Sequence, residues 1–158
     1  MLKKILLSFL LISTFAVAND IETSGSLKIT AEVVKPLTLT TEPLNFGIVA
    51  QGGTKTASES GSIKIEGQAG RSVNLSFISN GVENNLFKDD ISLSHTSDES
   101  QTILYRPNVT LEGSKLSTST IALDGGEVEL KVGGTVTTSS DALLGEYNTD
   151  VTIRVAYN

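Results

Sequence analysis

Hydrophobic residues in this chain alternate with polar ones over short runs, and no stretch of ten or more residues keeps a helical period. Alternation with a period of two is typical of β-strands that bury one face, and turn residues between such runs favour antiparallel pairing. The runs cover residues 25–34, 37–41, 44–48, 61–67, 71–79, 91–95, 108–113, 120–123, 128–132 and 145–158. This spacing predicts an all-β chain folded as an antiparallel sandwich.

The first run, residues 25–34, lies close to the N-terminus and is followed by the link Lys35-Pro36. Its apolar positions are Leu27, Ile29, Ala31 and Val33. Pro36 lacks a backbone donor, so it favours a break between this run and the rest of the chain. A strand so near a free end can pair with another molecule. Because Leu37 and Leu39 continue the same parity, a shifted register stays open.

The last run, residues 145–158, is the most regular one in the chain. Its apolar positions of one parity are Tyr147, Val151, Ile153, Val155 and Tyr157. We expect one terminal strand here, with an edge that needs a partner strand. The two ends together indicate a subunit that gives its first strand to one neighbour and accepts a strand beside its last.

Turn residues make further local predictions. The connection Gln68-Ala69-Gly70 separates two alternating runs and suggests that residues 61–67 and 71–79 form a hairpin. Residues 98–107 are ambiguous because Ile103, Leu104 and Tyr105 are contiguous, and Pro107 would confine a strand there to the edge of a sheet. Residues 80–90 lose the alternation and predict a surface loop in which Leu86 and Phe87 tuck inward. Residues 139–144 are expected to be a connection with one helical turn.

The first 18 residues predict a secretory signal peptide that is cleaved after Ala18. Lys3 and Lys4 precede an apolar segment, and Ala16-Val17-Ala18 supplies the small residues of a cleavage site. The apolar segment is too short to span a bilayer of about 30 Å. Removing 18 of the 158 residues leaves 140, which suits one domain. The mature protein is expected to be exported.

Composition narrows the possible partners. Loss of the two leader lysines changes the formal net charge from -6 to -8, and the remaining basic residues are scattered, which argues against nucleic acid. The chain has no cysteine, which excludes disulfides and thiol catalysis. Aromatic residues make up only 5%, which disfavours a carbohydrate-binding surface built on stacked rings.

The candidate chemistry is weak. His95 is the single histidine and lies near Asp98 and Glu99 in the sequence, where we expect a solvated turn. No second histidine or cysteine completes a zinc site, and the pairs Asp89-Asp90 and Asp98-Glu99 lack the spacing of a calcium loop. We therefore expect no catalytic residue, no metal and no cofactor, and we do not expect an enzyme.

Three segments carry a family resemblance: VVKPLTLTTEPLNFG at residues 33–47, LKVGGTVT at 130–137, and the alternation from 145 to the terminal Tyr-Asn at 158. Together they resemble pilin-like domains of bacterial chaperone-usher fimbriae. The likeness is nearer to the cysteine-free major subunits of the common-pilus and class 5 (alpha-fimbrial) type than to disulfide-bearing type 1 pilins. It extends over nearly all of the mature chain.

The resemblance implies an immunoglobulin-like sandwich that lacks its last strand and is completed by a donated one. A periplasmic chaperone would lend a strand first, and at an outer-membrane usher the N-terminal extension of an identical or related subunit would replace it. The protein would end in a cell-surface fimbrium. The implied donor positions are Leu27, Ile29, Ala31 and Val33. The implied groove edge comprises Val151, Ile153, Val155 and Tyr157. No receptor can be named.

This interpretation divides the chain into a signal peptide (residues 1–18), an N-terminal extension with the donor strand (19–35) and an immunoglobulin-like domain (36–158). The alternative is a self-contained secreted immunoglobulin-like adhesive module. In that case residues 25–34 pair within their own domain, and a loop such as residues 80–90 binds a ligand. A subunit that is stable as a monomer without a chaperone would favour the alternative.

Overall fold

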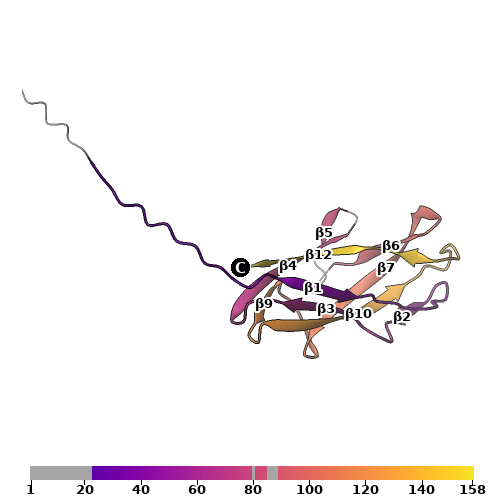
Figure 1. The fold of residues 1–158 in the computed structure, drawn as a ribbon. Coiled ribbons are helices and arrows are strands. Elements are labelled where there is room, and N and C mark those ends of the chain that lie inside the picture. Colours follow the sequence, from indigo (N-terminus) through magenta and orange to yellow (C-terminus); the bar gives the residue numbers. More distant parts are fainter. Residues whose placement is uncertain (1–22, 80, 85–88) are drawn as a thin grey trace, which may run out of the picture. The chain divides into compact units, whose positions relative to one another are not determined.

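The computed structural model describes residues 23–79, 81–84 and 89–158. The folded body comprises Val33–Asn158, and the described residues before it, 23–32, contain neither helix nor strand. The predicted leader with its cleavage site lies outside the described residues, and so do Leu86 and Phe87. In Figure 1 the colours of the strands follow the chain from indigo to yellow.

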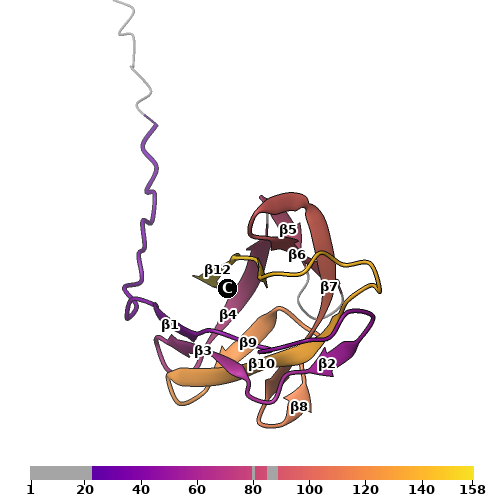
Figure 2. The ribbon, with the colours of Figure 1, turned by 90° about the vertical axis from the view of Figure 1, so that its right-hand side faces the viewer.

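The body consists of two antiparallel β-sheets that face each other (Figures 1 and 2). The larger sheet contains β1 (Thr38–Glu42), β2 (Thr54–Thr56), β3 (Gly61–Glu66), β6 (Ile91–His95), β7 (Asp98–Leu111), β8 (Ser114–Lys115), β10 (Glu127–Thr137) and β11 (Tyr147–Asn148). The smaller sheet contains β4 (Arg71–Ser79), β5 (Val82–Asn84), β9 (Thr120–Leu123) and β12 (Val151–Tyr157). The prediction of an all-β, immunoglobulin-like sandwich is confirmed.

Inward-facing side chains of both sheets form one main core. Its fully buried members come from alternate positions of β3, β4, β7, β9 and β10, as the two-residue period predicts. They include Ile65, Val73, Phe77, Leu123 and Leu130. The core is aliphatic with few rings, and no disulfide is available to it because the chain lacks cysteine.

The prediction of a hairpin around residues 68–70 is wrong. β3 pairs with β1 and β10 in the larger sheet, whereas β4 pairs with β12, β5 and β9 in the smaller one. The chain therefore crosses from one sheet to the other at this connection. Ile65 and Val73 therefore face the common core from opposite sheets, which a hairpin within one sheet would not allow.

The last alternating run is not one continuous strand. Tyr147 and Asn148 form β11, which pairs with β6 in the larger sheet, and only Val151–Tyr157 forms β12 in the smaller sheet. The expected strand at residues 44–48 is also absent, since this segment is an irregular connection in the structure. Residues 139–144 are a connection as expected, with one hydrogen-bonded turn from the Ala142 N–H to the Ser139 carbonyl oxygen but no helix. Each segment connects two strands of the larger sheet and pairs with no strand of the described structure.

Pro107 lies in the interior of the larger sheet and not at its edge. The 14-residue strand β7 pairs with β10 on one side, where Pro107 is opposite Gly134. On the other side β6 reaches only as far as Tyr105, and β8 begins opposite Thr110. The proline therefore occupies a position that is paired on one side only. Because neither β6 nor β8 pairs with Pro107, its lack of a backbone N–H costs no ladder hydrogen bond on that side, although β7 lies inside the sheet.

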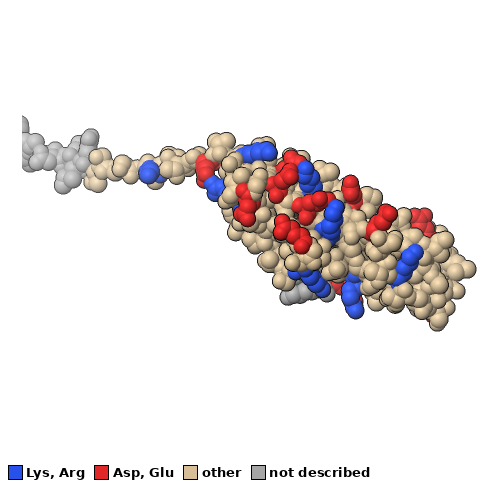
Figure 3. All heavy atoms as spheres, turned by 90° about the horizontal axis from the view of Figure 1, so that it is seen from below, with Lys and Arg blue, Asp and Glu red and all other residues tan. Residues whose placement is uncertain are grey.

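Charged groups of both signs are intermixed on the surface of the body (Figure 3). Lys64 pairs with Glu66 at 2.9 Å and with Glu127 at 3.4 Å, all on exposed positions of the larger sheet. The surface in this view thus has no large single-sign field that would attract a polyanion. In the part of the chain that is described, no helix is long and apolar enough to cross a membrane.

Candidate functional site

The last strand, β12, is paired on one side only. Its ladder with β4 runs from Val151 opposite Ser79 to Tyr157 opposite Val73. No described strand pairs with its other edge. The four side chains that face inward stay half-buried although they pack against the core. They are Val151, Ile153, Val155 and Tyr157. Such an edge exposes backbone donors and acceptors beside apolar surface.

The first strand of the other sheet, β1, is also an edge, because it pairs only with β3. The β1 side and the β12 side come together at both of their ends. At one end the Tyr157 hydroxyl lies 2.6 Å from the Lys35 carbonyl oxygen. At the other end Val151 and residues 43–49 line the same cavity. The two unpaired edges, of β1 and β12, therefore lie on either side of one line between the two sheets, which we call the seam.

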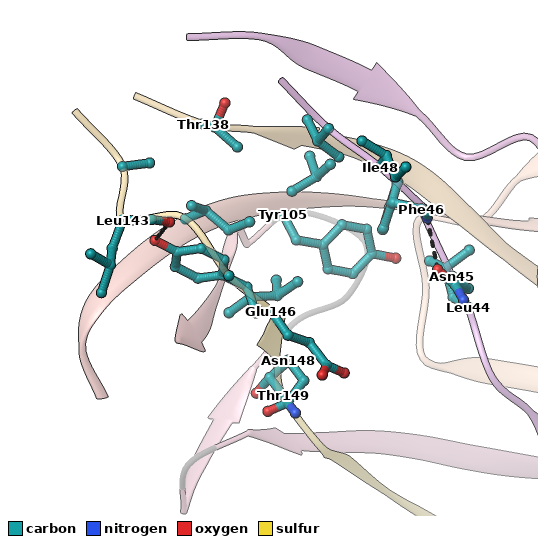
Figure 4. A pocket seen from close by; sticks show the side chains of 18 of the residues that line it. Leu44, Asn45, Phe46, Ile48, Tyr105, Thr138, Leu143, Glu146, Asn148 and Thr149 are labelled. Carbon is teal, nitrogen blue, oxygen red and sulfur yellow. Dashed lines mark hydrogen bonds between the residues drawn. The ribbon is translucent and has the colours of Figure 1, made fainter. Parts of the chain in front are cut away.

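The cavity at this seam has a volume of about 710 Å³. Figure 4 shows Phe46 and Ile48 on one side of it and Leu143 on the other. The floor consists mainly of apolar side chains from the larger sheet, among them Leu93, Ile103, Tyr105 and Val136. The space is lined for aliphatic or aromatic side chains and offers no cluster of charges.

Tyr105 fixes the floor of the cavity. Its ring meets the Phe46 ring edge-on, with 5.4 Å between the ring centres. Its hydroxyl donates a hydrogen bond of 2.8 Å to the Gly133 carbonyl oxygen. Burial raises the pKa of Tyr105 above its usual value, so the hydroxyl stays protonated and acts as a donor. The floor is thus rigid and apolar.

The rim of the cavity is unusually apolar for a surface. Ile48 is 92% exposed and Leu144 is 76% exposed, and they come from the two segments on opposite sides of the cavity. These segments are joined where Gln51 Nε2 donates a hydrogen bond of 2.6 Å to the Ala142 carbonyl oxygen. An apolar rim around an apolar cavity indicates a binding surface for an apolar partner.

His95 is buried, and our expectation of a solvated turn is wrong. The side chain is only 4% exposed, and its ring meets the Tyr147 ring edge-on at 5.0 Å. The Ser97 amide can only donate, so it identifies Nδ1 as an acceptor at 3.2 Å. Nε2 then carries the proton and donates to the Leu144 carbonyl oxygen at 3.3 Å. His95 therefore supports the segment that forms one side of the cavity.

The alternation of residues in β6 by itself indicates that His95 faces inward. His95 continues the parity of Ile91 and Leu93 in β6, and these positions face inward. Asp98, by contrast, is exposed, and its carboxylate accepts hydrogen bonds from the backbone N–H and the hydroxyl group of Ser100. Leu44 and Phe46 were expected as a strand and are instead part of the cavity wall.

The apolar positions of the predicted donor strand are exposed. Leu27 and Ile29 are each 85% exposed, and Val33 is 96% exposed. Ala31 is exposed as well. Residues 23–37 belong to no strand, so the structure leaves these side chains available to another chain.

The described residues contain no group of three or more His, Asp or Glu side chains that could hold a metal ion. His95 uses both ring nitrogens in hydrogen bonds to its own chain. The site is therefore defined by an open strand edge and apolar surface.

No family profile and no curated protein sequence matches this chain. Among solved structures it is similar to a chain from a chaperone–tip adhesin complex described as vital for synergistic activation of CFA/I fimbriae biogenesis. The TM-score is 0.48 and the sequence identity is 14%. The match covers 76% of this chain but only 41% of the other. So distant a likeness assigns neither a function nor a partner to this chain.

Proposed function

We propose that this protein is a structural fimbrial subunit that polymerises by donor-strand complementation. The N-terminal extension of one copy would lie along the open edge of β12 in the next copy. The polymer would support adhesion at the cell surface, and the role would be structural and not catalytic.

The observation that carries this proposal is the unpaired edge of β12 together with its half-buried apolar row. The seam beside it ends in an apolar cavity, which suits side chains that project from a strand laid along the edge. The chain also contains a matching strand pattern that is unused in the described structure, at Leu27, Ile29, Ala31 and Val33. A donor and an acceptor are thus both present in one molecule, which is what a head-to-tail polymer needs.

The expected energy suits a stable polymer. Burial of a large aliphatic side chain contributes about 1.5 to 3 kcal/mol, and alanine contributes less. Four donor side chains would give roughly 5 to 9 kcal/mol before backbone pairing and ordering costs are counted. Backbone hydrogen bonds along β12 would add to this. Such a strand should leave its groove very slowly.

The same edge implies helper proteins before assembly. An exposed edge beside apolar surface is an aggregation hazard for a subunit that has no partner. A periplasmic chaperone that lends a strand would protect it, and an outer-membrane usher would exchange that strand for the extension of the next subunit. This route leads from a secretory leader through the periplasm to a surface fimbrium.

The substitution Ile29→Asp tests the proposal. An uncompensated carboxylate in an apolar groove costs several kcal/mol, so the variant should be unable to give its strand. Ile29 lies outside the folded body, and the variant should therefore fold and still accept a strand. The matched control is Thr30→Asp, which places the same charge on the opposite face of the strand.

The experiment uses the purified subunit with its chaperone and a synthetic peptide covering residues 25–34. We expect the peptide to displace the chaperone from wild-type and Ile29→Asp subunits and to raise their thermal stability. Thr30→Asp subunits should polymerise, and Ile29→Asp subunits should remain monomeric. An unfolded Ile29→Asp subunit, or a peptide without effect, would favour the self-contained adhesive module, in which this run belongs to its own domain.

A further inference from the structure

The Tyr157 hydroxyl binds the chain at the point where the N-terminal extension joins the body. It donates a hydrogen bond of 2.6 Å to the Lys35 carbonyl oxygen and accepts one of 2.7 Å from the Gln68 backbone N–H. The Gln68 side-chain oxygen accepts a hydrogen bond of 3.4 Å from the Lys35 backbone N–H. Both backbone polar groups of Lys35 are therefore held, one by β12 and one by the connection between β3 and β4.

The local sequence favours this arrangement. Pro36 fixes its own backbone angle and restricts Lys35 to an extended conformation. Gly67 leaves room for the phenol: a Cβ atom there would lie 2.6 Å from the Tyr157 hydroxyl oxygen and 2.8 Å from Leu37 Cδ2. Any side chain at position 67 would thus displace the hydroxyl from its partners. We refer to Lys35, Gln68 and Tyr157 as the root clamp.

All three tyrosines of the chain donate to a backbone carbonyl group, but the partners differ in kind. Tyr105 binds Gly133 inside the larger sheet, and Tyr147 binds Leu143 four residues away in the same segment, each at 2.8 Å. Tyr157 instead binds Lys35, the third residue of the folded body, which begins at Val33. Its hydroxyl can therefore influence the direction of the extension in addition to the stability of the body.

We propose that Tyr157 is a positioning residue that fixes the root of the donated strand. This inference rests on the proposed function, in which the extension connects one copy to the next. Tyr157 also ends the edge that accepts a strand, so one side chain joins the accepting edge to the root of the given strand. The root clamp then sets the angle between successive subunits, and with it the bending stiffness of the fibre.

The test compares Tyr157→Phe with the control Ser100→Ala, which also loses one hydrogen-bonded hydroxyl group but lies on the exposed start of β7. Gln68→Ala is a second variant, since Gln68 is exposed and its truncation removes only the bond to the Lys35 N–H. Two quantities are measured. Amide hydrogen exchange at Gln68 and Lys35 is followed in the monomeric subunit held with the peptide of residues 25–34, and the persistence length of assembled fibres is measured by electron microscopy.

We expect the Gln68 amide of Tyr157→Phe to exchange about five to ten times faster, because its acceptor is lost. The Lys35 amide should exchange faster in Gln68→Ala. Fibres of both variants should form but have at most about half the wild-type persistence length, whereas Ser100→Ala should leave exchange at the root and fibre stiffness unchanged.

Each of three results would contradict either the root clamp, its effect on the fibre, or the proposed function. Unchanged exchange at Gln68 in Tyr157→Phe shows that no root clamp exists in solution. Faster exchange with fibres as stiff as those of Ser100→Ala shows that the clamp does not set fibre geometry. Wild-type subunits that form no fibres contradict the proposed function itself, and the clamp is then judged by the exchange rates alone.

Discussion

Gly145 lies directly against the imidazole ring of His95, and a Cβ atom on Gly145 would overlap His95 Nε2. The glycine has a backbone φ of 151°, which side-chain-bearing residues rarely adopt. The contact joins the end of β6 to the segment before β11, and that segment forms one side of the apolar cavity. The shape of the cavity thus depends on the absence of a side chain at one position.

Gly145→Ala should destabilise the body by about 2 to 4 kcal/mol, because it adds overpacking to backbone strain. The measurement is the midpoint of urea unfolding. Gly125→Ala is the control, since a Cβ atom there meets nothing within 4 Å, and it should change stability by less than about 0.5 kcal/mol. Equal midpoints for the two variants would show that the His95 contact is not tight in solution.

His95→Ala should cost about 2 to 4 kcal/mol, since it removes a buried ring and its bond to the Leu144 carbonyl group. The exposed Glu99 serves as the control through Glu99→Ala, which should be nearly neutral. Thermal unfolding of both variants checks this. If His95→Ala melts like the wild type, the ring does not support this segment.

Deletion of residues 156–158 should abolish fibre formation. It removes the pairing of Tyr157 with Val73 and the hydrogen bond from Asn158 N–H to the Ser72 carbonyl oxygen, and it shortens the edge that we propose accepts a strand. Fibres are counted by electron microscopy of surface-sheared material. The control Arg154→Gln alters an outward side chain of the same strand and should assemble normally. Normal fibres from the truncated chain would mean that β12 is not the accepting edge.

Asp90 should contribute to stability in a pH-dependent way. Its two carboxylate oxygens accept hydrogen bonds of 2.9 Å each from Nε and Nη2 of Arg106, which lowers the pKa of Asp90 from its ordinary value of 3.8. A lowered carboxyl pKa stabilises the fold above that ordinary value, and the contribution is lost as the pH falls through the folded-state pKa. It is therefore present at neutral pH and absent in strong acid.

The measurement compares the unfolding midpoints of Asp90→Asn and the wild type at neutral pH and at about pH 2, in low salt. The midpoints should differ at neutral pH and coincide in acid. Glu99→Gln, a change of charge at an exposed residue, serves as the control and should leave the midpoint at neutral pH unchanged. A difference that persists unchanged in acid would show that the effect of Asp90 does not come from its charge.

The sequence by itself determined the fold class and most of the strands. Alternation is a local property, and it identified the inward positions of β3 and β4, such as Ile63, Ile65, Val73 and Leu75, because burial of one strand face selects apolar residues at every second position. It also singled out the apolar parity of β12. The same pattern at Leu27 and Ile29 predicts a strand, but residues 23–37 belong to no strand in the described structure.

Only the tertiary structure decided which strands are neighbours. Alternation states that a strand has an inner face but not which sheet it joins, so the crossing at residues 67–70 and the division of the last run between two sheets followed from closure of a common core. For the same reason the sequence did not predict the burial of His95 or the hydrogen bond from the Tyr157 hydroxyl to the Lys35 carbonyl oxygen. Each depends on contacts between segments far apart in the chain, and these exist only once both sheets have packed.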